Sequence, residues 1–213
     1  MFTGIVQGVG QVAVIDDRPG LRSFEFSLEP RLTTGLEIGA SVAVDGVCLT
    51  VTAFTERSVH FDVMRQTLDT TTLGSLVEGG SVNIERSARY GDEVGGHVVS
   101  GHIDATARIA AIDETENNRE IDYRVDPVLM PFILSRGFIA LNGCSLTVAS
   151  VDRAANTFRV CLIPETLRAT THGGKRLGDK LNLELDRQTQ AIVSTVQSYL
   201  KDNRDWLQSL LPS

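Results

Sequence analysis

The sequence lacks several features that would place the protein in a particular class. No run of about 18 apolar residues occurs, which excludes helical membrane spans. The opening MFTGIVQGVG has neither the basic nor the long apolar segment of a secretory signal, so we expect a cytoplasmic protein. Cations are in deficit, since 20 Lys and Arg against 27 Asp and Glu give a formal net charge of −7. Nucleic acid and membrane partners are therefore not expected.

Cysteine and proline are also scarce. Cys48, Cys144 and Cys161 are odd in number and show no CxxC spacing, which argues against a disulfide framework or a zinc site and predicts free thiols. Only 6 Pro accompany 19 Gly, a composition that indicates many turns without low-complexity linkers. The 213 residues allow one large domain or two of about 100 residues each.

The most informative feature of the sequence is an internal duplication. VAVDGVCLTV at 42–51 returns as IALNGCSLTV at 139–148, and aligning Gly46 with Gly143 gives an offset of 97 (143 − 46). The same offset aligns further pairs, namely Gly4 with Gly101 and Phe61 with Phe158. The correspondence therefore extends well beyond one local motif.

The alignment shifts in its last part. TLDTTTLG at 67–74 matches TLRATTHG at 166–173 with an offset of 99 (166 − 67), so two residues have been inserted in the second copy. A period this long is outside the range of solenoid repeats and predicts two copies of one domain. We expect a first barrel at 1–96, a second barrel at 97–186 and a terminal helix at 187–213.

Each copy reads as a series of short strands. Segments such as QVAVID, SFEFSLE, LTVTAF and SVHFDVM alternate apolar and polar residues or are rich in Val, Ile, Phe and Thr, with turn residues between them. About six strands of this size at even spacing predict a small antiparallel barrel. Short helical turns are expected only around residues 31–36 and 127–135.

The segment after Asp186 is predicted to be a helix because it contains no glycine and no proline until its last two residues. Its apolar positions recur at alternating steps of four and three, a pattern that fits packing against copies of itself or docking on its own barrel. This stripe consists of Ile192, Val196, Tyr199, Asn203, Trp206 and Leu210, in which the polar Asn203 weakens the pattern but could fix a register.

Positions at which the two copies differ indicate chemistry. Cys48 aligns with Ser145, and Ile5 aligns with His102. Two further pairs exchange polar groups, Asp45 with Asn142 and Asp62 with Arg159. A symmetric scaffold with unlike polar groups could bind two similar ligands and treat them differently.

The thiol of Cys48 is the strongest nucleophile in this set if its pKa is lowered, although a buried inert cysteine is the common alternative. His97 and His102 could transfer protons near neutral pH, and a structural role is the alternative for each. Hydroxyl groups recur at matched places as hydrogen-bonding groups for a polar heterocycle, at Thr50, Thr147, Ser145, Thr67 and Thr166.

Six strings together resemble the riboflavin synthase family (alpha subunit) of duplicated lumazine-binding barrels. They are MFTGIVQG, VDGVCLTV, GGHVVSGHID, GFIALNGCSLTV, IPETLRATT and LNLELDRQTQA, in the family's order and with its duplication. The resemblance implies an all-β fold of two tandem six-stranded antiparallel Greek-key barrels with a C-terminal α-helix through which three subunits associate. In this family two molecules of 6,7-dimethyl-8-ribityllumazine bind per site, and a four-carbon unit passes from one to the other.

The resemblance also implies riboflavin and a ribitylamino-pyrimidinedione as products, with no cofactor and no metal. Some relatives associate with lumazine synthase. The working site of the family lies between the first barrel of one subunit and the second barrel of a neighbour. Fluorescent carriers of lumazine or flavin share the fold without turnover and are the alternative function. A flavin-barrel reductase would need a further nicotinamide-binding domain.

Carried over by position, the resemblance implies two substrate-binding sets. The first comprises Gly4, Ile5, Val6, Cys48, Leu49, Thr50, Asp62, Val63, Met64, Arg65, Gln66 and Thr67. The second comprises Gly101, His102, Ile103, Ser145, Leu146, Thr147, Ile163, Pro164, Glu165, Thr166, Leu167 and Arg168, with Arg136 reaching across from another chain.

Catalysis is assigned by the same resemblance. Cys48 and His102 are expected to act as the base and the nucleophile, in an order that the sequence does not decide. Ser145 and Thr147 would orient the second substrate, and Phe2 would help to close the site. The sequence departs from the family pattern in two respects: the turn residues Asp45 and Asn142 are exchanged between the copies, and Gln66 stands where Glu is common.

Overall fold

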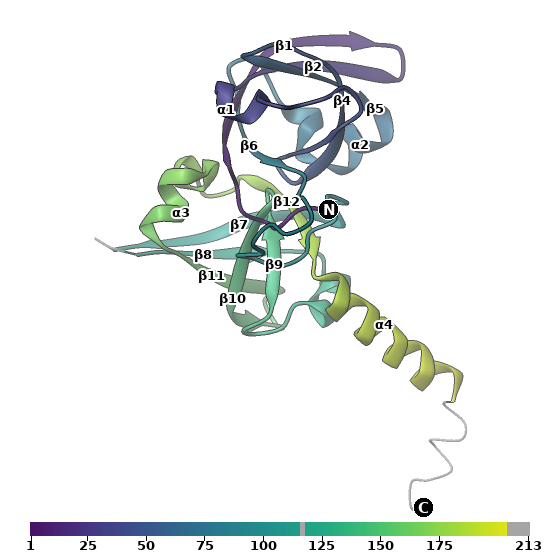
Figure 1. Cartoon of the computed structure of the whole chain (residues 1–213). Helices are drawn as coiled ribbons and strands as arrows, with labels where there is room; N and C mark the ends of the chain where they lie inside the picture. Colours follow the sequence, from purple (N-terminus) through teal and green to yellow (C-terminus); the bar gives the residue numbers. More distant parts are fainter. Residues whose placement is uncertain (116–117, 204–213) are drawn as a thin grey trace, which may run out of the picture.

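Two closed six-stranded antiparallel barrels make up most of the protein, as expected (Figure 1). The computed structural model describes residues 1–115 and 118–203. The first barrel has the strand order β1-β2-β5-β4-β3-β6. Its strands are β1 Gly8–Arg18, β2 Leu21–Ser27, β3 Ser41–Val44, β4 Val47–Phe54, β5 Ser58–Met64 and β6 Ser81–Arg86.

The second barrel repeats this order as β7-β8-β11-β10-β9-β12. Its strands are β7 Ala105–Glu114, β8 Arg119–Arg124, β9 Phe138–Leu141, β10 Cys144–Asp152, β11 Thr157–Leu162 and β12 Lys180–Leu185. The chain therefore folds as two copies of one topology. The expected division at residue 96 stays a prediction.

The strand pairing corrects the alignment of the two copies. Val51 lies opposite Phe61 in the first barrel, and its equivalent Val148 lies opposite Val160 in the second. Phe61 is therefore equivalent to Val160, an offset of 99 (160 − 61), because the two extra residues lie in the β10–β11 hairpin before this strand. The prediction that Asp62 is equivalent to Arg159 was wrong; with the same offset Asp62 is equivalent to Cys161.

Apolar side chains fill the interior of both barrels. In the first barrel Phe26 and Phe61 are fully buried, with ring centroids 5.9 Å apart, and in the second Tyr123 and Phe158 stack at 5.5 Å. Interiors packed in this way have no room for a ligand as large as a fused two-ring heterocycle. Any binding surface must therefore lie on the outside of the barrels.

Short helices occur where two were expected and also where none was. The expected turns are α1 Pro30–Thr33 and the 3₁₀ helix η2 Pro127–Phe132. The unexpected ones are α2 Arg65–Thr70 with η1 Thr72–Ser75, and α3 Pro164–Ala169 with η3 Thr171–Gly174. Both α2 and α3 have only six residues, too few to show a helical period in the sequence.

The terminal helix α4 Arg187–Asp202 extends away from the second barrel (Figure 1). Asp186 caps its N-terminus by accepting a hydrogen bond from the Thr189 amide at 2.9 Å. Its apolar stripe stays exposed, since Ile192, Val196 and Tyr199 retain 65%, 51% and 57% of their surface. Docking on its own barrel is therefore the wrong one of the two interpretations. Trp206 and Leu210 lie outside the described residues. No helix within residues 1–115 and 118–203 is long and apolar enough to cross a membrane.

The two barrels meet through their β3–β4 and β9–β10 turns. In each turn two consecutive residues have positive φ, Asp45 and Gly46 in one and Asn142 and Gly143 in the other, the requirement of a type I′ hairpin. A β-carbon on Gly46 would lie 2.6 Å from the Gly143 nitrogen, so only glycine permits this approach.

Asparagines from β6 and β12 join the barrels across this contact. Asn83 Nδ2 donates to the Asn142 carbonyl and Asn182 Nδ2 donates to the Asp45 carbonyl, each at 2.9 Å. The backbone amide of Asn83 also donates to Asp45 Oδ1 at 2.8 Å. Burial nevertheless raises the pKa of Asp45 to about 6, because desolvation outweighs this bond and the charge of Lys175.

We expect Asp45→Asn to raise the free energy of unfolding at pH 7 by about 3 kcal/mol. The pKa of about 6 in the folded state lies above the ordinary value of 3.8, so wild-type stability falls as pH rises through that window. The gain should shrink from pH 6 to pH 4 and vanish below. Urea unfolding at several pH values measures it.

The matched variant Asn142→Asp places a carboxylate at the equivalent buried position of the other turn. It should lower the free energy of unfolding at pH 7, with the loss disappearing near pH 4. Identical pH profiles for the wild type and Asp45→Asn would contradict the assignment of this titration to Asp45.

Candidate functional site

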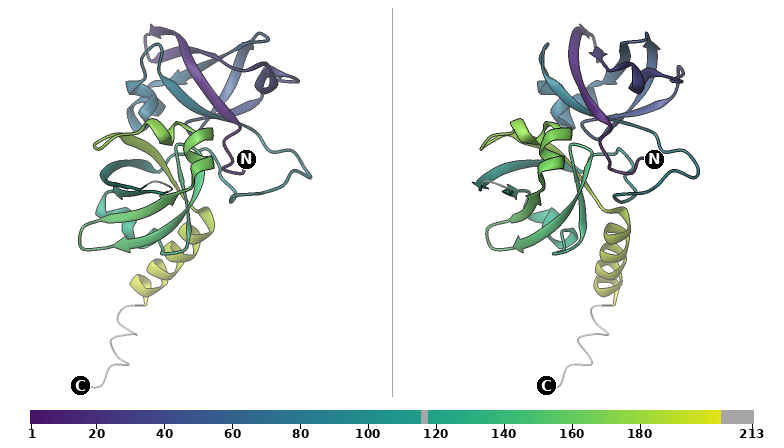
Figure 2. Two further views of the ribbon diagram at one scale, coloured as in Figure 1. Left: turned by 90° about the vertical axis from the view of Figure 1, so that its left-hand side faces the viewer. Right: turned by 60° about the vertical axis from the view of Figure 1, so that its left-hand side comes forward.

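Each repeat lends a segment to the outer surface of the other repeat's barrel. We call residues 1–6 the N-terminal crossing segment and residues 97–103 the central crossing segment; both lie at the junction of the barrels (Figure 2). The two segments pair through an antiparallel bridge in which the Phe2 amide donates to the Val99 carbonyl at 2.8 Å and the Val99 amide returns a bond at 3.0 Å.

The crossing brings Gly101 onto Cys48 and Gly4 onto Ser145. The Cys48 amide donates to the Gly101 carbonyl at 2.9 Å, and the Ser145 amide donates to the Gly4 carbonyl at 2.8 Å. A β-carbon on either glycine would lie 2.5 Å from the β-carbon of its partner. Both glycines have positive φ, so the close approach and the backbone conformation each require glycine.

This arrangement corrects the predicted division of the site residues. Gly4, Ile5 and Val6 were grouped with the first barrel, but they lie on the second, where Val6 packs against the apolar core. Gly101, His102 and Ile103 were grouped with the second barrel, but they lie on the first, where Ile103 packs. The two surfaces are therefore composite, each built from both repeats.

A buried glutamate holds each crossing segment. Glu85 Oε1 accepts from the Thr3 amide at 2.6 Å and its hydroxyl at 2.8 Å, and Oε2 accepts from the Gly4 amide at 3.1 Å. Glu184 repeats the pattern with the Ser100 amide at 2.7 Å, its hydroxyl at 2.6 Å and the Gly101 amide at 2.9 Å. Burial raises the pKa of Glu85, although these bonds oppose the shift.

The first surface gathers the thiol, hydroxyl and imidazole expected there. Along β4 the side chains alternate, so that Leu49 is buried in the core while Cys48 is half-buried and Thr50 is exposed on the outer face. His102 follows Gly101 directly, and its side chain is exposed. This places a thiol and an imidazole on neighbouring backbone segments, while Thr67 lies in the first turn of α2.

The second surface has hydroxyl groups where the first has a thiol. Ser145 and Thr147 occupy the outer face of β10, and Leu146 is buried beneath. Ile5 stands where the first surface has His102. The two surfaces share one backbone frame and differ in nucleophile and proton carrier.

His97 lies beside the second surface, a position that could not be predicted from the sequence. Its Nδ1 lies 2.6 Å from Ser145 Oγ, its ring stacks on Phe138 at 5.2 Å, and it is only 7% exposed. Burial lowers the pKa of His97, although Asp186 opposes the shift. With hydrogen on Nε2, the neutral ring accepts the Ser145 hydroxyl hydrogen. Only the fold reveals this pair, because the residues are 48 positions apart.

Several predicted residues cannot touch a ligand with their side chains. Phe2 was expected to close the site, but it is 2% exposed and packs with Val99, Ala43 and Ala140 in a cluster against which Cys48 lies. Phe2 therefore supports the thiol from below. The other buried members, which can offer only backbone groups, are Leu49, Val63 and Leu146.

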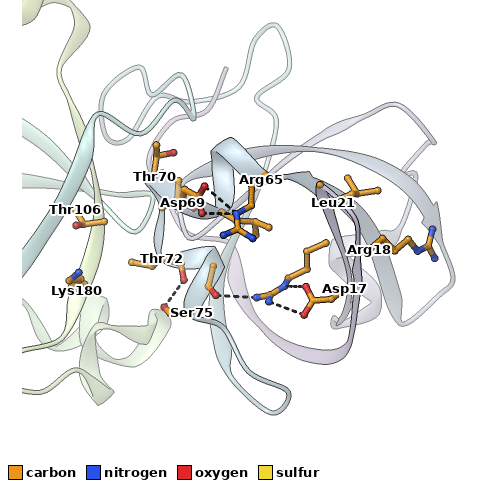
Figure 3. Close-up of a pocket in the computed structure, with 15 residues that line it drawn as sticks. Asp17, Arg18, Leu21, Arg65, Asp69, Thr70, Thr72, Ser75, Thr106 and Lys180 are labelled. Atoms are coloured by element: carbon orange, nitrogen blue, oxygen red, sulfur yellow. Dashed lines mark hydrogen bonds and ion pairs between the residues drawn. The ribbon is translucent and has the colours of Figure 1, made fainter.

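Four of the predicted residues, Val6, Arg65, Glu165 and Arg168, border two open cavities beside α2 and α3. A cavity of about 500 Å³ (Figure 3) is lined by Arg65 and by residues of both barrels, Thr106 and Lys180 among them. Another of about 410 Å³ is lined by Val6, Glu165 and Arg168. On the α2 side Arg65 pairs with Asp69 at 3.0 Å, and on the α3 side Arg168 pairs with Glu165 at 2.6 Å.

Other predicted residues lie at the exposed ends of strands and turns. Asp62 accepts a bond from Ser23 at 2.6 Å, and Met64 and Ile163 are 69% and 62% exposed. Arg136, at positive φ in the turn before β9, has an exposed side chain. The rest of the two sets lie in the first turns of α2 and α3, at Gln66, Pro164, Thr166 and Leu167.

The other two cysteines are poor candidates for a nucleophile. Burial raises the pKa of Cys144 to about 12, so it stays a thiol at neutral pH. Cys161 is exposed, but its pKa is raised by partial burial and by the neighbouring Glu120. Cys48 is the cysteine that lies beside an imidazole-bearing segment.

The sequence is similar to those of known proteins. The lumazine binding domain family matches residues 3–87 and again 100–186. The sequence is 50% identical to the riboflavin synthase of Escherichia coli (strain K12) over 201 residues, 94% of this chain and 93% of that one. It is 44% identical to the riboflavin synthase of Chlamydia pneumoniae over 200 residues, 94% and 97% of the two chains.

Solved structures are similar as well. LumP complexed with riboflavin superposes with a TM-score of 0.80 at 27% identity, covering 88% of this chain and 100% of that one. LumP complexed with 6,7-dimethyl-8-(1'-D-ribityl) lumazine gives a TM-score of 0.79 at 26% identity with the same coverage.

We expect Gly101→Ala to lower the free energy of unfolding by about 3 kcal/mol, because it combines a positive φ with a clash against Cys48. Gly35→Ala is the matched control, since Gly35 also has positive φ but faces open space. It should cost only the backbone part, about 1 kcal/mol. Urea unfolding measures both, and equal losses would mean that the crossing contact is not tight.

Proposed function

The chain belongs to the riboflavin synthase family and forms riboflavin enzymatically, and on this premise we propose which of its residues perform the reaction. Two molecules of 6,7-dimethyl-8-ribityllumazine dismutate: one gives a four-carbon unit to the other, and the products are riboflavin and 5-amino-6-ribitylamino-pyrimidinedione. Because one substrate supplies what the other receives, the reaction balances without an external oxidant or reductant.

The observation that carries the proposal is the pair of composite surfaces with one backbone frame and unlike side chains. One substrate molecule binds at the Cys48 surface and the other at the Ser145 surface. Backbone groups of β4 and β10 read the pyrimidine edge of each, and Thr50 and Thr67 contribute hydroxyls to the first surface. Unlike side chains then give identical molecules opposite fates.

The chemistry starts with removal of a proton from the 7-methyl group of one lumazine, which leaves a carbanion delocalised into the ring. The other lumazine becomes electrophilic when a nucleophile adds at its C7. Cys48 and His102 perform these two steps, while Ser145 and Thr147 orient the second molecule. The hydrogen bond between His97 Nδ1 and Ser145 Oγ, at 2.6 Å, holds the serine hydroxyl in place.

Holding two substrates in register supplies part of the acceleration, on the order of several kcal/mol. In a single subunit the two surfaces lie on different barrels, and both open to the outside. The site is completed when the first barrel of one subunit faces the second barrel of another, with Arg136 reaching across. Three subunits associate through the exposed apolar stripe of α4.

The small polar substrate and product fit a cytoplasmic location. We also expect an association with lumazine synthase, the enzyme that by its name forms the substrate.

The first test mixes the purified protein with 6,7-dimethyl-8-ribityllumazine, without cofactor and with a chelator, and follows riboflavin absorbance. Many turnovers per subunit are expected. Cys48→Ser should lower kcat at least about tenfold, because an alcohol is a far weaker nucleophile at neutral pH. Cys161→Ser, which removes an exposed thiol, should stay within about twofold of wild type.

Tight binding with changed fluorescence but no riboflavin would contradict the synthase and favour a chromophore carrier. Full activity of Cys48→Ser would remove the thiol from the chemistry and leave the reaction itself unaffected.

Subunit association has its own test. Val196→Glu puts a charge in the apolar stripe of α4 and should convert a trimer into monomers, with loss of turnover. Lys201→Ala changes a polar position of the same helix and should leave the trimer intact. Gel filtration with light scattering measures mass, and a fully active monomer would rule out a site shared between subunits.

A further inference from the structure

The two crossing segments are held alike by Glu85 and Glu184, but the central one has a second holder. Arg187, the first residue of α4, donates from Nη2 to the His102 carbonyl at 2.6 Å and from Nη1 to Asp104 Oδ1 at 3.0 Å. Its Nε lies 3.7 Å from Glu184 Oε1. The guanidinium of Arg187 therefore contacts three groups around His102: the carboxylates of Asp104 and Glu184 and the carbonyl of His102 itself.

Among residues 1–115 and 118–203, no arginine holds the N-terminal crossing segment in such a clamp. With the offset of 99 that relates β6 to β12, Arg187 is equivalent to Ala88 (187 − 99). The side chain of Ala88 has no group that could donate to the N-terminal crossing segment, and only its backbone amide does so, to the Met1 carbonyl at 3.1 Å. Thus the repeats agree in the glutamate and differ in the arginine. The arginine is present on the surface that has the imidazole and absent where Ile5 takes its place.

The clamp belongs to a wider polar cluster between α4 and residues 102–104. Asp104 Oδ2 accepts from the Leu185 amide at 2.8 Å, and Arg187 Nη1 also donates to Gln190 Oε1 at 2.7 Å. The Asp104 side chain keeps 14% of its exposure and that of Glu184 keeps 2%. Hydrogen bonds between charged groups in such partly buried places are stronger than those on an open surface.

The His102 ring is exposed, so its position depends on how firmly its backbone is held. Glu184 fixes the preceding amide of Gly101 at 2.9 Å, Ser100 Oγ accepts from the His102 amide at 3.2 Å, and Arg187 fixes the His102 carbonyl. Without Arg187 the backbone beyond the Gly101 contact loses its holder on the carbonyl side.

We propose that Arg187 is a positioning residue that holds His102 beside Cys48 and joins the first turn of α4 to the first surface. This inference rests on the proposed function, in which His102 takes part in the chemistry. Hydrogen bonds of Arg187 therefore connect α4, the helix assigned to subunit association, with His102, a residue assigned to the chemistry.

The test compares Arg187→Ala, which copies the first repeat, with Arg187→Lys and with the control Arg153→Ala. Arg153 also donates one bond to a backbone carbonyl, that of Met130 at 2.9 Å, but on the far hairpin of the second barrel. In riboflavin formation Arg187→Ala should lower kcat about tenfold with KM within about twofold. Arg187→Lys should recover part of the loss, and the trimer should persist.

A second readout does not depend on turnover. Alkylation by iodoacetamide, followed by mass spectrometry, reports how well the central crossing segment covers Cys48, with exposed Cys161 as internal reference. Arg187→Ala should label Cys48 several-fold faster relative to Cys161, and Arg153→Ala should not.

Unchanged Cys48 labelling in Arg187→Ala would overturn the proposal whether or not the wild type forms riboflavin. A kcat within about twofold of wild type, or an equal fall in Arg153→Ala, would overturn it as well. Absence of riboflavin from the wild type, with faster Cys48 labelling in Arg187→Ala, would leave the clamp standing and refute the proposed function.

Discussion

The back-to-back contact of two glycine turns is the constraint on which the rest of the structure depends. Gly46 and Gly143 approach so closely that neither has room for a β-carbon, and this fixes the distance between the barrels. At that distance the amides of Asn83 and Asn182 reach the opposite turn, and the crossing segments reach the opposite barrel. A bulkier turn would separate each crossing segment from the strand that it completes.

Much of the fold follows from sequence because local signals and the duplication agree. The Asp-Gly and Asn-Gly turns at residues 45–46 and 142–143 indicate tight hairpins, and the strands with alternating apolar and polar residues indicate a barrel. The helices α2 and α3 were missed because each has only six residues, too few to show a helical period of apolar residues. The insertion was misplaced because Phe61 and Phe158 are both aromatic and therefore seemed to match. The strand pairing shows that the equivalent of Phe61 is Val160, since Val51 pairs with Phe61 and its equivalent Val148 pairs with Val160.

The site was foreseeable in its members but not in its assembly. An alignment shows that Gly4 is equivalent to Gly101. It does not show on which barrel each segment lies, because the two glycines are equivalent whether the segments stay on their own barrels or cross. The crossing is decided by long-range contacts such as those of Glu85 and Glu184, which leave no local pattern. For the same reason the His97–Ser145 pair could not be read from spacing. The chemical asymmetry of the surfaces was readable, since it consists of side-chain identities at aligned positions.

The reciprocal exchange of crossing segments has the geometry of a domain-swapped dimer in which both partners happen to be covalently joined. A chain containing one repeat alone would keep a barrel with an uncovered β4 or β10 and a free arm, and two such chains could satisfy each other by trading arms. Joining them in tandem replaces a concentration-dependent encounter with an intramolecular one, whose effective concentration is set by the connecting stretch. The tandem chain also frees the two arms from being identical. A histidine beside one surface and an isoleucine beside the other is a distinction that a symmetric pair of single-repeat chains cannot make.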